Sequence, residues 1–247
     1  MFSGLEALTE RPYPGRFIVI GENEAGAGVV VYGITGRSPS SQARRLILRE
    51  DVQSGSLVEV EVTDPAVLNQ GSPALLVYPA LIAGRAVSVS NGAQTTDVAH
   101  AFDCRPLEAL ERAHRKWGYE PDAPNFTPRI SGRLETLGLH HPDNDAFLGI
   151  IRRGAGGLAY RSFFHVPLVR GRGAFISTYD GRNTNPLVSF SGEPLVVAIP
   201  SATPAETAQH FYDAFAPREG GNDFRVSVAC AYLPSAYKPE IALVNRF

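Results

Sequence analysis

Residues 16–34 read RFIVIGENEAGAGVVVYGI, which is two short apolar runs separated by a glycine-containing turn. The runs at 16–21 and 29–34 are too short for typical helices and are rich in valine and isoleucine, as strands are. Gly26 and Gly28 lie between them and favour a tight connection. We therefore expect the two runs to pair as an antiparallel hairpin.

Strand-like runs dominate the rest of the chain. We expect strands at 46–48, 57–62, 74–83, 85–90, 146–151, 157–163, 174–179, 195–199, 224–231 and 240–244. The run at 57–62 alternates apolar and acidic residues, which indicates one solvent-exposed face.

Two helices are expected between these strands. One spans 106–117, with Asp103 as a candidate N-cap, and the other spans 204–215, with Thr203 and Glu206 as a capping box. Because strands cluster and helices do not alternate with them, we predict an α+β fold with antiparallel sheets. We expect a single domain over 1–247.

Composition excludes several classes of protein. The formal net charge is −2 and lysine plus arginine number 23, so no basic field exists to hold nucleic acid. Cys104 and Cys230 are far apart, which fits free thiols in a reducing compartment and gives no zinc site. No signal-peptide pattern is visible and no apolar run reaches the roughly 18 residues of a spanning helix, so we expect a cytoplasmic protein without a membrane partner.

The segment 36–44, GRSPSSQAR, gathers groups that bind anions. It offers the guanidinium groups of Arg37 and Arg44, the hydroxyls of Ser38, Ser40 and Ser41, and the backbone N–H groups of a small-residue loop. This is the chemistry of a cradle for a phosphate or a carboxylate.

Four other positions are candidates, each with a structural alternative. Asn91-Gly92 is typical of a hairpin turn, but the polar residues that follow do not continue as a strand, so Asn91 is also a candidate substrate-binding group. Glu120 precedes a proline and is held extended, as a base or as a solvated surface group. Arg129 lies at a strand entry. The adjacent histidines at 140–141 lack a second ligand pair, so we interpret them as part of a polar loop and expect no metal.

The order of these segments resembles the archaeal-type IMP cyclohydrolase family and its bacterial relatives. The matching segments lie within residues 14–180. In chain order they are Gly15-Arg16-Phe17, Tyr32, Gly36-Arg37-Ser38, Arg44, Tyr78, Ser90-Asn91-Gly92, Tyr119-Glu120, Thr127-Pro128-Arg129-Ile130, Asp145-Ala146-Phe147-Leu148-Gly149-Ile150 and Ile176-Ser177-Thr178-Tyr179.

This resemblance implies a four-layer α-β-β-α fold like that of the N-terminal-nucleophile hydrolases. It implies an enzyme that closes the ring of 5-formamidoimidazole-4-carboxamide ribotide to give IMP in purine biosynthesis, without a covalent nucleophile. A mononucleotide is the implied partner, no metal or organic cofactor is required, and assembly into a homo-oligomer is expected.

The resemblance also implies roles for individual residues. Arg44, Tyr78 and Glu120 match the catalytic positions. The expected substrate-binding residues are Arg37, Ser38, Ser41, Asn91, Gly92, Arg129 and Tyr179. In this interpretation the arginines and serines of 36–44 bind phosphate or polarise the formyl oxygen, and Tyr78 donates to that oxygen or shuttles a proton. Glu120 orients the carboxamide or acts as base, and Asn91 and Arg129 position the base ring or the ribose phosphate.

Three departures from the family pattern leave other functions open. Pro79-Ala80 follows Tyr78, where archaeal members have Asn-Cys; Gln94 stands where a histidine is often found; and 134–143 is an insertion relative to shorter forms. One alternative is therefore a related cyclase or hydrolase that acts on another amide, for example in secondary metabolism. A second is a nucleotide-binding module without catalytic activity.

Overall fold

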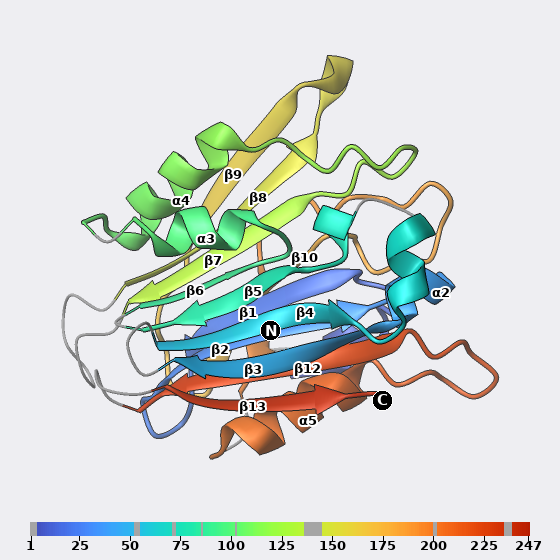
Figure 1. Ribbon diagram of the computed structural model, residues 1–247. Coiled ribbons are helices and arrows are strands. Elements are labelled where there is room, and N and C mark those ends of the chain that lie inside the picture. Colours follow the sequence, from blue (N-terminus) through green and yellow to red (C-terminus); the bar gives the residue numbers. More distant parts are fainter. Residues whose placement is uncertain are drawn as a thin grey trace.

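The computed structural model describes residues 4–51, 55–70, 73–84, 86–101, 103–135, 145–199, 202–234 and 239–247. Within these ranges the chain forms two antiparallel sheets and few helices (Figure 1). This confirms the α+β class with antiparallel sheets that the strand clustering predicted.

The six-stranded sheet is built around the predicted hairpin. Its spatial order is β11 (Leu195–Ala198), β10 (Arg172–Ser177), β1 (Arg16–Glu22), β2 (Gly28–Thr35), β12 (Arg225–Leu233) and β13 (Glu240–Asn245). Val19 of β1 pairs with Val31 of β2, which confirms the expected pairing of 16–21 with 29–34.

The seven-stranded sheet follows the chain in order. Its strands are β3 (Arg44–Asp51), β4 (Gly55–Val62), β5 (Tyr78–Ala83), β6 (Ala86–Ser90), β7 (Arg129–Glu135), β8 (Asp145–Arg153) and β9 (Ala159–His165). Burial alternates along most of β4, as its apolar and acidic residues predicted.

The expected strand at 74–83 was wrong in its first part. Pro73–Leu75 forms a 3-10 turn, and the N–H groups of Leu76 and Val77 both donate to the carbonyl of Pro73.

Helices cover the outer faces of both sheets (Figure 1). Helices α3 (Gln94–Ala99) and α4 (Pro106–Lys116) pack on the seven-stranded sheet, and α5 (Pro204–Ala214) packs on the six-stranded sheet. The remaining short elements are α1 (Glu6–Thr9), α2 (Pro39–Gln42) and 3-10 segments at Pro65–Gln70 and Ala155–Gly157.

Both expected helices, at 106–117 and 204–215, are confirmed. The Thr203 hydroxyl accepts a hydrogen bond from the N–H of Glu206, as the predicted cap requires. The candidate cap Asp103 was wrong, because the helix begins at Pro106 and its N-cap is Arg105, which makes no side-chain cap hydrogen bond. Helix α3 was not expected, since its sequence QTTDVA has no apolar periodicity.

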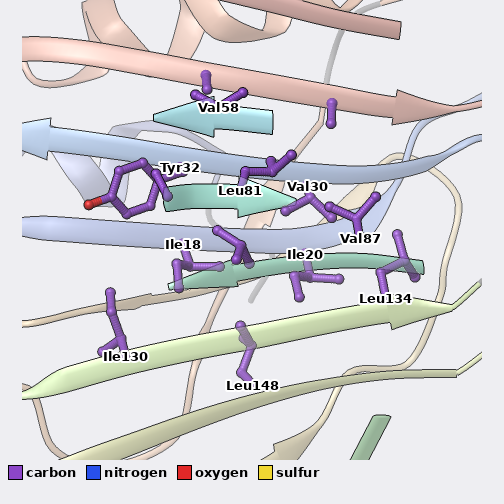
Figure 2. Close-up of a cluster of buried hydrophobic side chains, with 14 of the residues drawn as sticks. Ile18, Ile20, Val30, Tyr32, Val58, Leu81, Val87, Ile130, Leu134 and Leu148 are labelled. Carbon is purple, nitrogen blue, oxygen red and sulfur yellow. The ribbon is translucent and has the colours of Figure 1, made fainter. Parts of the chain in front are cut away.

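Alternating side chains of each inner strand pack against two different layers. Ile18 and Ile20 of β1 point toward the other sheet, whereas Phe17 and Val19 lie in the cluster that includes residues of α5. Figure 2 shows labelled members of the inter-sheet cluster: Ile18, Ile20, Val30, Tyr32, Val58, Leu81, Val87, Ile130, Leu134 and Leu148. Because both faces of β1 and β2 are buried, these strands are apolar throughout rather than alternating.

His114 is an unusual member of the outer layer. It lies on α4 with its ring 5.3 Å from that of Phe163, and neither ring nitrogen has a hydrogen-bond partner among the described residues. Burial, with a smaller contribution from Arg161, lowers the pKa of His114 to about 3. The imidazole is therefore neutral in the folded protein at neutral pH.

This burial predicts an acid-sensitive fold. As the pH falls from about 6.5 toward 3, the unfolded chain takes up a proton at His114 that the folded chain does not. The free energy of unfolding then drops by up to about 1.4 kcal/mol per pH unit. Urea unfolding at pH 7 and pH 5 should show a smaller pH-dependent loss in His114→Leu than in wild type.

The exposed His210 on α5 provides the control. His210→Leu removes an exposed histidine instead of the buried one, and all other titrating groups cancel in the comparison. An equal loss of stability between pH 7 and pH 5 in wild type and His114→Leu would contradict the assignment.

Candidate functional site

Four charged or phenolic side chains occupy the first residue of a strand. Arg16 begins β1, Arg44 begins β3, Tyr78 begins β5 and Arg129 begins β7. Within an antiparallel sheet the starts of alternate strands lie at the same edge. Arg16 and Tyr78 interact electrostatically with each other and with both Arg44 and Arg129, so the starts of β1, β3, β5 and β7 meet at one end of the molecule.

Arg44 is the most deeply buried of these groups, with 1% of its surface exposed. Its Nε donates to the carbonyl of Ser41 at 2.9 Å. Its two terminal nitrogens are buried and have no hydrogen-bond partner within the described part of the chain. Burial, and next the positive charge of Arg16, lower the pKa of Arg44. Such a group presents strong donors to an anion.

Two phenols lie beside this guanidinium. The hydroxyls of Tyr32, from β2, and Tyr78 are 2.8 Å apart and form a buried hydrogen bond between the two sheets. Both tyrosines interact electrostatically with Arg44 and with Arg16. The phenol of Tyr78 therefore lies next to two positive charges.

Arg16 is a site residue that the sequence did not single out for a role. Its Nε is buried without a partner among the described residues, and it interacts electrostatically with Tyr78, Glu120 and Tyr179. Gly15, which precedes it, has a φ of +76°, and a Cβ there would lie 2.2 Å from Oγ1 of Thr178. The sequence offered two signals, an arginine that opens an apolar run and the family-matched segment Gly15-Arg16-Phe17, but neither gave Arg16 a role.

Glu120 follows helix α4 and is 2% exposed. Its N–H donates to the carbonyl of Thr127 at 2.8 Å, which holds the loop against the segment that leads into β7. Its Oε1 lies 3.4 Å from Nδ2 of Asn91 and 3.8 Å from Nη1 of Arg129. Burial raises the pKa of Glu120 to about 7, although Arg16 and Arg129 oppose this shift. A carboxyl group with this pKa is suited to proton transfer at neutral pH.

Asn91 is held in place from several directions. Its Oδ1 accepts from the N–H of Ile130 at 2.7 Å, and its Nδ2 donates to the carbonyl of Pro128 at 2.9 Å. Asn91-Gly92 connects β6 to α3, so the interpretation as a hairpin turn was wrong. Asn91 instead joins the end of β6 to the start of β7.

Gln94 links Asn91 to Arg129. Its Nε2 donates to Oδ1 of Asn91 at 3.2 Å, and its Oε1 accepts from Nη1 of Arg129 at 2.9 Å. The Arg129 guanidinium also lies over the ring of Trp117, 4.7 Å from its centre. A Cβ on Gly92 would lie 2.4 Å from Nη1 of Arg129, so only glycine leaves room for this arrangement.

Tyr179 lies on another side of the cluster. Its hydroxyl is 2.6 Å from Oγ1 of Thr127, and burial raises its pKa well above the usual range. Tyr13 stacks on Tyr179 with ring centres 5.9 Å apart. The guanidinium of Arg37 lies 5.9 Å from the centre of the Tyr13 ring and donates to the carbonyl of Thr184 at 2.9 Å. Arg37 thus lies beyond this aromatic stack, whereas Arg44 lies within the buried cluster.

The serines of the 36–44 loop build the turn that precedes Arg44. The N–H of Ser38 donates to Oγ of Ser41 at 2.9 Å, and the N–H of Ser41 donates to Oγ of Ser38 at 3.2 Å. This reciprocal cap starts α2 and brings the chain to β3. The hydroxyls of Ser38 and Ser41 therefore have local partners in this turn, and the turn itself contacts Arg44 through the carbonyl of Ser41.

Among the residues described, no group of three or more His, Cys, Asp or Glu side chains could hold a metal ion. The histidines at 140–141 lie outside the described ranges. In the same ranges no helix is long and apolar enough to cross a membrane.

Comparison with known proteins shows to which family the chain belongs. The chain belongs to the IMP cyclohydrolase-like family, because the family model described as "IMP cyclohydrolase-like protein" matches residues 13–232. This confirms the family suggested by the order of the sequence segments.

A particular relative is an IMP cyclohydrolase from the archaeon Methanopyrus kandleri. The two proteins are 36% identical over 121 residues, which is 48% of this chain and 57% of the archaeal protein. The match thus spans little more than half the length of that relative.

The buried guanidinium of Arg44, whose terminal nitrogens have no partner among the described residues, should make the wild-type protein less stable than a variant without it. Arg44→Met fills the same space without burying an unpaired charge, so the free energy of unfolding should rise by about 1–3 kcal/mol. Urea denaturation monitored by tryptophan fluorescence or circular dichroism measures this change.

Arg49→Met is the matched control on the same strand. Arg49 is exposed and forms ion pairs with Glu59 and Glu61, and because water screens such pairs its loss should leave stability nearly unchanged. A marked loss of stability in Arg44→Met would show that the guanidinium is satisfied within the protein.

Proposed function

We propose that this chain is an IMP cyclohydrolase, which closes the ring of 5-formamidoimidazole-4-carboxamide ribotide with loss of water. Membership of the family and the name of the archaeal relative support this activity. The helices on the outer faces of both sheets support a four-layer α-β-β-α fold of the N-terminal-nucleophile-hydrolase type. The proposal includes a cytoplasmic location and assembly into a homo-oligomer, as the family resemblance implies.

The observation that carries the proposal is the cluster formed by Arg44, Tyr78 and Glu120. Each of them is at most 3% exposed, and they come from two strand starts and a loop that are far apart in the sequence. Arg44 interacts electrostatically with both other residues. Buried donors beside a carboxyl group of near-neutral pKa are what a dehydrative ring closure needs.

The reaction itself sets three requirements. The carboxamide nitrogen must approach the formyl carbon to about 3–3.5 Å, because it is a weak nucleophile. Negative charge develops on the formyl oxygen as the C–N bond forms, and a donor directed at that oxygen stabilises it. One proton from the carboxamide nitrogen and one from the formamide nitrogen then leave with that oxygen as water, while the C–O bond breaks.

The residues of the cluster meet these requirements. The terminal nitrogens of Arg44 bind the phosphate or the formyl oxygen, and the hydroxyl of Tyr78 donates to the oxygen as its charge grows. Glu120 accepts the proton from the carboxamide nitrogen, because its raised pKa allows it both to take up and to release a proton at neutral pH. Asn91 and Arg129 position the nucleotide and fix the Glu120 carboxylate.

Gln94 and Pro79 favour one alternative, a related cyclase or hydrolase acting on another amide. Gln94 places a neutral amide between Asn91 and Arg129, where related sequences often have a histidine. The test is to measure turnover of the purine ribotide by the pure protein, using the absorbance of IMP as the signal. Rates above background by several orders of magnitude support the proposal; background rates with tight IMP binding would favour a nucleotide-binding module instead.

Two conservative variants test the assigned chemistry. Tyr78→Phe should lower kcat by about 10²–10³, the usual effect of losing one oxyanion donor. Glu120→Gln should lower kcat by about 10²–10⁴, the usual contribution of a general base. Activity within a few-fold of wild type in both variants would remove these residues from the mechanism.

The raised pKa of Glu120 predicts the pH dependence of the reaction. If the carboxylate is the base, kcat/KM should fall about tenfold per unit as the pH drops below about 7. The residual activity of Glu120→Gln should lack this descending limb. A limb of equal slope and midpoint in both proteins would assign it to another group.

A further inference from the structure

Tyr32 is a buried phenol for which the proposed mechanism gives no role. It is 0% exposed and sits on β2 in the inter-sheet cluster of aliphatic side chains. Figure 2 shows its ring among these side chains, with the hydroxyl oxygen at the margin of the drawn cluster. A phenol in such a place needs a hydrogen-bond partner, because an unpaired buried hydroxyl is costly.

The only partner that the described residues offer to the Tyr32 hydroxyl is the hydroxyl of Tyr78, at 2.8 Å. Each phenol carries one proton, so one of the two donates and the other keeps a proton for another acceptor. The neighbouring Arg16 and Arg44 cannot take that proton, since a guanidinium group only donates. The direction of the pair therefore decides which tyrosine can donate to a ligand.

The surroundings of the two phenols differ. If Tyr78 donated to Tyr32, the proton of Tyr32 would be left without an acceptor among the described residues, because Tyr32 is 0% exposed and its charged neighbours Arg16 and Arg44 accept no hydrogen bond. If Tyr32 donates, the free proton belongs to Tyr78, which starts β5 beside the arginine cluster and is 3% exposed. The second arrangement leaves no hydroxyl proton unpaired once a ligand oxygen is bound.

We propose that Tyr32 is a positioning residue that donates to Tyr78 and thereby makes Tyr78 a hydrogen-bond donor to the substrate oxygen. The proposal rests on the proposed function for its kinetic consequence. Donation by Tyr32 polarises the Tyr78 hydroxyl, so the donor bond that Tyr78 makes becomes stronger. The bond also fixes the position of Tyr78 on one sheet relative to β2 on the other.

Burial keeps Tyr32 in the protonated form that a donor requires. It raises the pKa of Tyr32 well above the usual value for a phenol, and the nearby Tyr78 shifts it in the same direction. Tyr32 therefore keeps its proton at neutral pH. A permanently protonated phenol is a dependable donor.

Neutron diffraction from crystals of the deuterated wild-type protein tests the direction without any assay. We expect the deuterium on the Tyr32 oxygen to lie on the line to the Tyr78 oxygen. Density for a Tyr78 deuterium pointing at Tyr32 would overturn the proposal, whatever reaction the protein catalyses.

Kinetics test the consequence. Tyr32→Phe keeps the ring and removes the hydroxyl, so kcat should fall about 3- to 10-fold, the effect of one neutral hydrogen bond, with KM within about twofold of wild type. In a Tyr78→Phe background the same change should have no further effect on kcat, because the two residues act through one bond.

Tyr232→Phe is the matched control. The Tyr232 hydroxyl is buried and lies 2.6 Å from the Thr207 hydroxyl, in the layer between β12 and α5. This variant should lose stability like Tyr32→Phe but keep the wild-type kcat. If Tyr78→Phe is impaired while Tyr32→Phe keeps full kcat, the role of Tyr32 is refuted and the proposed function stands. If wild type does not turn over the ribotide, the proposed function fails and the neutron result alone decides the role of Tyr32.

Discussion

The packing of two sheets against each other through apolar side chains limits where the charged groups of the inner strands can lie. Both faces of β1 and β2 are buried, one against the second sheet and the other against α5. A charged side chain in the middle of these two strands would have no partner, and the arginine of β1 lies at its first residue. Arg16, Arg44 and Arg129 all occupy such positions.

The same constraint means that the site lowers the stability of the fold. Three arginines face two carboxyl groups in the cluster: Glu120, whose own pKa is raised by burial, and Asp122, which interacts electrostatically with Arg129 and Glu120. Unpaired buried donors cost stability, and the apolar core on either side of the sheets compensates for that cost. The imbalance of charge is suited to an anionic ligand, which would bring the acceptors that the terminal nitrogens of Arg44 lack within the described residues.

The sequence predicted most of the fold, because strand patterns and helix caps are local signals. The hairpin at 16–34, the exposed face of β4 and the cap at Thr203 all follow from neighbouring residues. Two features were missed: helix α3, and the start of the strand expected at 74–83, which begins only at Tyr78. Short polar helices and proline-directed turns carry no apolar period.

The site was predictable in part and for a different reason. Arg44, Tyr78 and Glu120 came from the order of segments shared with a family, and the structure brings them into one cluster. Arg16 and Tyr32 belong to the same shared segments, but the segments gave them no role. Their roles depend on which sheet face a side chain points to and on which residue of the other sheet it meets. Tyr32 meets Tyr78 because β2 and β5 belong to two sheets that pack against each other.

The central claim is that these strand starts form one binding site for a mononucleotide. A crystal structure of the protein with bound IMP tests it most directly. We predict that the nucleotide lies at the starts of β1, β3, β5 and β7, with an oxygen within hydrogen-bond distance of the terminal nitrogens of Arg44. Ordered IMP elsewhere on the molecule, with the terminal nitrogens of Arg44 still without an acceptor, would contradict the account.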